Sequence, residues 1–144
     1  MNKIKIILAA LISVANLSAL TVTDVMVAVE NVESNLDPYA INVKEDARGC
    51  LQIRPIFLKD YNRITKQDLP HDVVFNRSMA YHITETVWMH YAKKIPNLNA
   101  KHLVFIHNGG GSAWRYVDDP NYGNAKKRSN LEIYWNKVKI HLNK

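Results

Sequence analysis

ESNLDPYAIN, residues 33–42, places a carboxylate at the end of a helical pattern and follows it with a polar run and a proline. The apolar residues before it recur at the i, i+3, i+4, i+7 spacing of an amphipathic helix, with Thr21 or Thr23 as the N-cap. These apolar residues are Val22, Val25, Met26, Val29 and Val32. The sequence therefore predicts a helix that ends close to Glu33.

The same spacing predicts how the two glutamates of this helix are oriented. At about 100° per residue, Glu33 falls inside the apolar arc and Glu30 falls just outside it. We therefore expect Glu33 to face partly into the core and Glu30 to face solvent. A carboxyl group that loses hydration has a raised pKa, as a general acid near neutral pH requires. The alternative is a helix-end glutamate bonded to nearby backbone or to an arginine.

The rest of the chain is also mostly helical in its periodicity. We expect helices at 72–94 and 101–107, the second ending at the glycines 109–111, and a last helix that begins at Ser129. Ser129 and Glu132 fit a capping box. The apolar stripe of this last helix is Leu131, Tyr134, Trp135, Val138 and Leu142. With a short hairpin expected between Ala40 and Asp46, the sequence predicts a single, mainly α-helical domain.

The composition suits one globular domain, since the chain has 144 residues, of which 47% are hydrophobic and 22% charged. Its first residues, MNKIK and IILAALISV, combine a basic start with a short apolar run, and small residues follow. This pattern predicts a secretory signal peptide at 1–19, cut after Ala15 or Ala19, and a mature domain at 20–144. An uncleaved anchor is the alternative. We thus expect an exported protein, either periplasmic or extracellular.

The net charge bears on the class of partner, and the cysteines and histidines bear on disulfides and metal sites. A net charge of +6 is too small to predict nucleic-acid binding, but it suits an anionic polymer such as a cell wall. The single Cys50 excludes an internal disulfide and is most simply a small buried hydrophobe. The six histidines show no metal-site spacing, so we expect neither a metal nor another cofactor.

Four blocks of sequence occur in an informative order. They are ESNLDP at 33–38, ARGCLQIRP at 47–55, IHNGG at 106–110 and IYWNKV at 133–138. This order resembles the lytic transglycosylases of the SLT domain family, which is related to goose-type lysozyme. The first two blocks carry most of the resemblance, which covers most of the chain after the signal. It implies a lysozyme-like α+β fold, mainly helical, with a groove.

The resemblance also implies roles for particular residues. Glu33 matches the catalytic acid, and the matching substrate-binding residues are Ser34, Gly49, Gln52, Asn108 and Tyr134. The sequence departs from the family pattern at three positions: Cys50 and Leu51 stand where Leu-Met is common, and His107 stands where tyrosine is usual.

Two of these positions also have a reading of their own. Gly49 permits a close backbone approach that a Cβ would block, and Gln52 offers a donor and an acceptor to sugar hydroxyls or acetamido groups. A loop glycine beside a polar surface residue is the plainer reading. The rings of Trp114, Tyr116, Tyr122 and Trp135 are candidates for sugar stacking, or simply pack in the core.

The number of acids bears on the reaction. Most glycosidases use two carboxyl groups, whereas only Glu33 has a motif here. The resemblance implies that one glutamate acts first as acid and then as base on peptidoglycan, which gives a 1,6-anhydro product. One alternative is a hydrolase in which Glu45 or Asp46 holds a water. The other is a glycan-binding or envelope-assembly protein without catalysis. The small size of the chain fits work beside an envelope-spanning machine.

Overall fold

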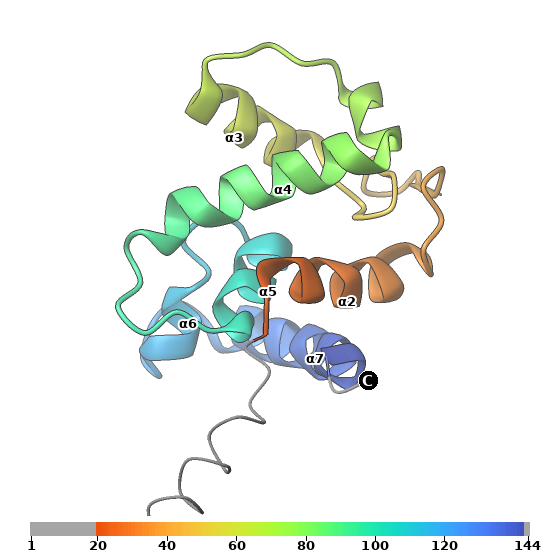
Figure 1. Ribbon diagram of the computed structural model, residues 1–144. Coiled ribbons are helices and arrows are strands. Elements are labelled where there is room, and N and C mark those ends of the chain that lie inside the picture. The colour runs from red at the N-terminus through yellow and green to blue at the C-terminus, as the bar shows by residue number, and fades with distance from the viewer. Residues whose placement is uncertain (1–19, 143–144) are drawn as a thin grey trace, which may run out of the picture.

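The computed structural model describes residues 20–142, which form a mainly helical domain with one small hairpin (Figure 1). In chain order the elements are α2 (Val22–Ser34), β1 (Ile41–Asn42), β2 (Ala47–Arg48), α3 (Pro55–Thr65), η1 (His71–Phe75), α4 (Arg77–Ala92), α5 (Ala100–Gly109), α6 (Arg115–Asp118) and α7 (Ala125–Leu142). The predicted fold class is confirmed. The predicted signal peptide at 1–19 lies outside the described residues. In the part of the chain that is described, no helix has the length and hydropathy needed to cross a bilayer.

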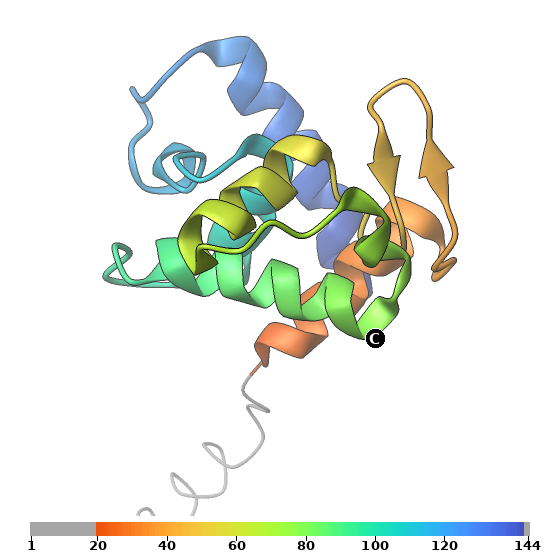
Figure 2. The ribbon, with the colours of Figure 1, turned by 90° about the horizontal axis from the view of Figure 1, so that it is seen from above.

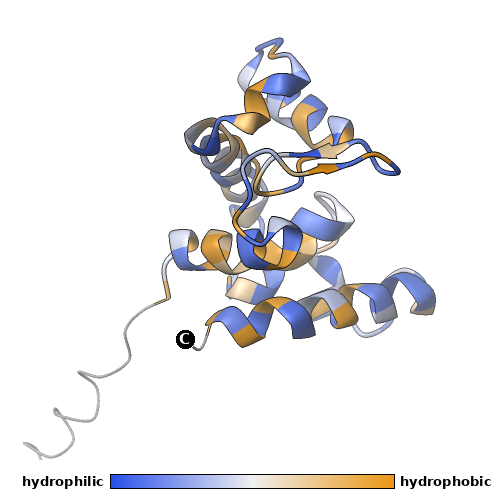
Figure 3. Ribbon diagram, turned by 90° about the vertical axis from the view of Figure 1, so that its right-hand side faces the viewer, coloured by the Kyte–Doolittle hydropathy of each residue, from blue (hydrophilic) through white to orange (hydrophobic). Residues whose placement is uncertain are grey.

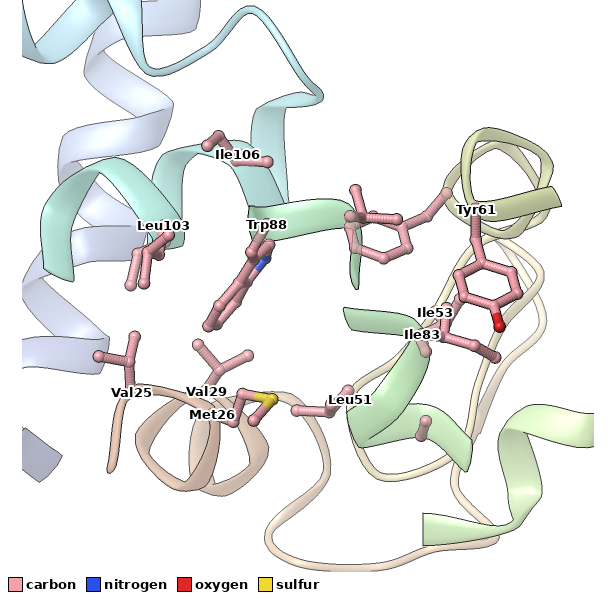
Figure 4. Close-up of a cluster of buried hydrophobic side chains, with 14 of the residues drawn as sticks. Val25, Met26, Val29, Leu51, Ile53, Tyr61, Ile83, Trp88, Leu103 and Ile106 are labelled. Carbon is pink, nitrogen blue, oxygen red and sulfur yellow. The ribbon is translucent and has the colours of Figure 1, made fainter. Parts of the chain in front are cut away.

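The helices are arranged in three tiers. In Figure 1, α3 and α4 lie above α2 and α5, and α7 lies below them. α5 contacts α2, α4, α6 and α7, and its residues 102–107 are all buried. Trp88 of α4 is also fully buried, with Leu103 and Ile106 of α5 beside it (Figure 4). The hydrophobic core thus lies around α5, against which α2, α4, α6 and α7 pack.

Local signals at both ends explain where α2 begins and ends. Thr21 is the N-cap, and its hydroxyl accepts from the Asp24 amide while the Asp24 carboxylate accepts from the Thr21 amide. This confirms one of the two predicted caps. The helix ends at Asn35, which adopts a left-handed conformation with φ 53°. One prediction here is wrong, because Glu30 is fully buried and does not face solvent.

The hairpin stands beside the C-terminal end of α2 (Figure 2). Ile41 pairs with Arg48 and Asn42 pairs with Ala47, so the second strand lies just beyond the predicted range of 40–46. Ile41 and Val43 are exposed, and Figure 3 shows hydrophobic residues on this projecting segment. The hairpin therefore forms a rim next to the end of α2.

Two helix predictions need correction, and one helix was not predicted. The unpredicted helix is α3, which starts with Pro55 at its first position. The expected helix at 72–94 is interrupted at Asn76, whose side chain caps α4 by accepting from the Met79 amide. α7 begins at Ala125 rather than Ser129, and Asn124 accepts from the Lys127 amide at 2.7 Å.

Candidate active site

Glu33 lies in the last turn of α2, with only 20% of its side chain exposed. Tyr134 of α7 donates its hydroxyl to Glu33 Oε1 at 2.5 Å. The pKa of Glu33 is raised, as predicted, because burial removes water from the carboxylate. The Tyr134 hydrogen bond and the charges of Arg54 and Lys137 oppose this shift, whereas the charge of Glu45 adds to it. The result is a carboxyl group that holds its proton more tightly than an exposed one.

A small polar cavity of about 50 Å³ lies at Glu33. The hairpin contributes Asn42, Glu45 and Ala47 to its lining. The remaining lining residues are Gln52, Arg54, His107 and Asn108. Segments that are distant in the sequence thus converge on one carboxyl group, and most of the groups around it are polar.

Three of the predicted substrate-binding residues contact this site. Gln52 and Asn108 line the cavity, and Tyr134 bonds Glu33 directly. The Gln52 side-chain nitrogen donates to the carbonyls of Ala40 at 3.1 Å and Gly49 at 2.9 Å. That nitrogen therefore holds the loop, and the amide oxygen is the acceptor that Gln52 can offer a sugar.

Ser34 and Gly49 do not line the cavity, in contrast to what the resemblance implies. The Ser34 hydroxyl is 2.7 Å from the Cys50 carbonyl, to which it donates. Gly49 has φ +76°, and a Cβ there would lie 2.2 Å from the carbonyl oxygen of Val74. The close backbone approach predicted for Gly49 is thus confirmed, but both residues position the loop that carries Gln52.

His107 closes one wall of the cavity. Burial lowers its pKa to about 4, so the ring is neutral near pH 7. Its Nε2 lies 2.9 Å from the Leu51 carbonyl and 4.0 Å from Glu33 Oε1. A carbonyl only accepts, so Nε2 carries the ring proton. Neutral His107 therefore brings no positive charge to Glu33.

Three residues that line the cavity, Asn42, Ala47 and Arg54, were not predicted from the sequence. The charged one is Arg54. It directly precedes α3, and its guanidinium donates to the Asn108 carbonyl at 2.8 Å. The resembling motif leaves this position unspecified, so no pattern in the sequence singled it out. The only local signal is a cation next to the proline that starts a helix.

The two glutamates of α2 are in opposite environments. Glu30 receives hydrogen bonds from Arg77, with Nη2 at 2.7 Å, and from the Tyr81 hydroxyl. A buried carboxylate bound to a guanidinium and a phenol is suited to holding elements together, because these bonds replace water that the carboxylate loses on burial. Within residues 20–142 Glu33 has no such ion pair, and of the two glutamates of α2 only Glu33 borders the cavity.

The remaining candidates differ in whether they line the cavity at Glu33. Asp46 bonds Arg48 Nε at 2.9 Å and does not line the cavity, whereas Glu45 does. Tyr116 is buried against Tyr122, and the other two candidate stacking rings, Trp114 and Trp135, are partly buried against the core. None of the four lines the cavity at Glu33.

Cys50 is fully buried, as the sequence predicted, and burial raises the pKa of its thiol to about 12. A thiol in this state is a poor nucleophile. Between residues 20 and 142, no three His, Cys, Asp or Glu side chains gather in a way that could hold a metal ion.

Comparisons with known proteins do not assign the chain to a family. No family model, curated protein or solved structure matches the chain. Any function must therefore be argued from the residues of the site itself.

Proposed function

We propose that this protein is a peptidoglycan lytic transglycosylase that cleaves the β-1,4 bond between N-acetylmuramic acid and N-acetylglucosamine. The observation that carries the proposal is Glu33, a carboxyl group with a raised pKa, bonded by Tyr134 and open to a polar cavity. The order of the four sequence blocks supports the same assignment. Because the proposed substrate is a wall polymer, we also propose export, which the signal-peptide pattern of residues 1–19 supports.

The proposed reaction uses Glu33 twice. The protonated carboxyl first gives its proton to the glycosidic oxygen as the bond to the muramyl C1 breaks. The carboxylate then removes the proton of the C6 hydroxyl of the same sugar while that oxygen bonds to C1. Glu33 ends protonated, one 1,6-anhydro sugar forms, and no water is consumed. Gln52 and Asn108 supply amide groups that can hold the sugar in the cavity.

A hydrolase is the second candidate, and Glu45 is the observation that favours it. Glu45 lines the cavity with Glu33, and its charge is one of those that raise the Glu33 pKa. Two carboxyl groups on either side of a sugar can activate a water. Asp46 is a weaker candidate for this role because Arg48 binds it.

Digestion of purified cell walls tests these proposals, with turbidity to follow release and mass spectrometry to identify the products. We expect anhydro ends, each lighter by one water than a hydrolysed end. Glu33→Gln should lower the rate by about 10²–10⁴-fold while the fold is retained. Glu45→Gln should cost far less, and Asp46→Asn serves as the matched control outside the cavity.

Two other outcomes would support a different function. Reducing ends together with an essential Glu45 would establish the hydrolase. Binding to walls without any release would establish a non-catalytic glycan-binding or assembly protein.

A further inference from the structure

A second hollow opens next to the polar cavity. It has a volume of about 420 Å³, and Arg54 and His107 line both spaces. One wall is the face of α3 that carries Ile56, Lys59 and Arg63, and the opposite wall is the backbone at Gly110 and Gly111. The two hollows therefore adjoin, with Arg54 and His107 between them, so a substituent that leaves the sugar close to Glu33 is near the groove.

The floor of this groove is apolar. Phe57, Val87 and Ile106 contribute it, from α3, α4 and α5. Gly110 adopts φ 90° and ψ 173°, and no atom lies within 4 Å of the place where its Cβ would be. The wall is therefore open at Gly110, whereas Gly111 packs against Tyr91.

The charged groups around the groove are mainly positive. Arg54, Lys59 and Arg63 line it, and Asp60 is the one carboxylate that lines it in the described chain. Asp60 bonds Arg63 at 2.5 Å and accepts from the Tyr91 hydroxyl at 2.6 Å, so its charge is already neutralised. Arg54 donates to the neutral Asn108 carbonyl and forms no ion pair within residues 20–142. The groove thus combines an apolar floor with two cations, Arg54 and Lys59.

This combination fits a particular part of the proposed substrate. The sugars of the glycan strand present neutral hydroxyl and acetamido groups, which gain little from an apolar floor between cations. The peptide stem on the muramyl sugar carries both methyl groups and carboxylates. It is attached to the sugar whose C1 reacts, so it must leave the site close to Glu33.

We propose that the groove between α3 and Gly110–Gly111 binds the carboxylate-bearing peptide stem, with Arg54 and Lys59 as its anion contacts. This inference rests on the proposed function and names the part of the substrate that sets its specificity. An anion above an apolar floor is attracted more strongly than one in open solvent, because less water screens it.

Binding to the Glu33→Gln protein tests the groove without turnover. The ligands are a disaccharide tetrapeptide and the same disaccharide without its peptide, compared by calorimetry. We expect the peptide to strengthen binding about tenfold, which is what burying two methyl groups is worth. Adding Lys59→Gln should weaken the peptide-bearing ligand about 2- to 5-fold, the range of an exposed charge pair, and leave the bare disaccharide unchanged.

Lys126→Gln is the matched control. It removes the same charge from an exposed residue of α7 that lines neither hollow, so both affinities should stay the same. Equal affinity for the two ligands, no binding of either, or an equal loss for both in Lys59→Gln would overturn the peptide subsite.

Failure of the proposed function gives a different pattern. If the wild-type protein releases nothing from walls while the Glu33→Gln protein still prefers the peptide-bearing ligand, the reaction is wrong and the groove assignment stands. If the wild-type protein cleaves intact walls and peptide-stripped glycan at one rate, the reaction stands and the subsite is wrong.

Discussion

Glu33 and Glu30 lie one turn apart on α2, yet Glu33 borders the polar cavity whereas Glu30 binds Arg77 and Tyr81. The helical pattern placed Glu33 at the edge of the core correctly, because that position depends only on its own helix. It misplaced Glu30, because the arginine that makes its burial possible comes 47 residues later in the chain. Arg54 escaped notice for a similar reason, since its partner Asn108 comes 54 residues later. Sequence periodicity reports apolar faces and cannot report such distant partners.

The proton on Glu33 predicts the pH dependence of the proposed reaction. The acid must start protonated, so activity falls as the pH rises through the Glu33 pKa, and burial moves this alkaline limb to higher pH. Tyr134 donates to the carboxylate and thereby favours its charged form. In Tyr134→Phe we therefore expect the limb to move further toward alkaline pH in profiles of kcat/KM.

The control for this prediction is Tyr122→Phe, which removes a hydroxyl from a tyrosine outside the cavity. Its profile should match that of the wild-type protein. An alkaline limb that stays in place in Tyr134→Phe would contradict the hydrogen-bond argument.

At the scale of elements, sequence signals located helices well where an apolar stripe or a cap marked them. Thr21 and the stripe of α2 are examples. The start of α7 was predicted one turn too late, because its first turn, Ala125 to Arg128, holds two lysines and an arginine and no large apolar residue to extend the stripe. α3 does carry a signal that would have found it, namely Pro55 at the first position ahead of the buried Phe57, Leu58 and Tyr61.

The contact between the 47–55 loop and η1 depends on a glycine. Gly49→Ala would combine a positive φ with an overlap against the Val74 carbonyl, so the loss of unfolding free energy should exceed about 2 kcal/mol. Gly110→Ala tests the conformational part alone, about 1–3 kcal/mol, because its methyl meets open space. Urea unfolding measures both. A smaller loss for Gly49→Ala than for Gly110→Ala would mean that the loop moves away freely.

The junction of α2 and α4 depends on the buried pair of Glu30 and Arg77. Arg77→Met leaves the Glu30 charge buried without its cation and should cost about 3 kcal/mol, toward the low end for buried pairs, because the Arg77 side chain is 55% exposed. Adding Glu30→Gln removes the uncompensated charge and should restore part of the loss. The free energies of unfolding of the wild-type protein, Arg77→Met and the double variant, measured by chemical denaturation, test this prediction. A double variant no more stable than Arg77→Met would show that the charge is not the cause.

At the scale of the whole molecule, the predicted fold class was correct because most of the chain is helical and the helices pack around two hydrophobic clusters that share Trp135 at their edge. The convergence of four distant segments on Glu33 could not be predicted from periodicity. Only the order of the motif blocks suggested it. The site is thus a product of tertiary packing, and the pair of Glu33 on α2 and Tyr134 on α7 is its clearest example.

Export is the prediction that concerns the chain as a whole. Thr21 and Asp24 cap α2, so a cut that preserves Thr21 leaves this first helix intact. In an exporting host we expect the mature protein to begin between Asn16 and Thr21, outside the cytoplasm, and intact-mass measurement can establish this. Full-length chain in the membrane fraction would instead indicate an uncleaved anchor.

Because Cys50 is buried, the rate at which its thiol is chemically labelled measures how fast the site opens. A thiol reagent can reach this single cysteine only when the loop that carries Gly49 and Gln52 lifts away from α2. The labelling rate at high reagent concentration is then the opening rate of the site, and its dependence on urea separates a local opening from global unfolding. A bound glycan that seals the loop should slow this labelling, so one sulfur atom reports substrate residence without any turnover.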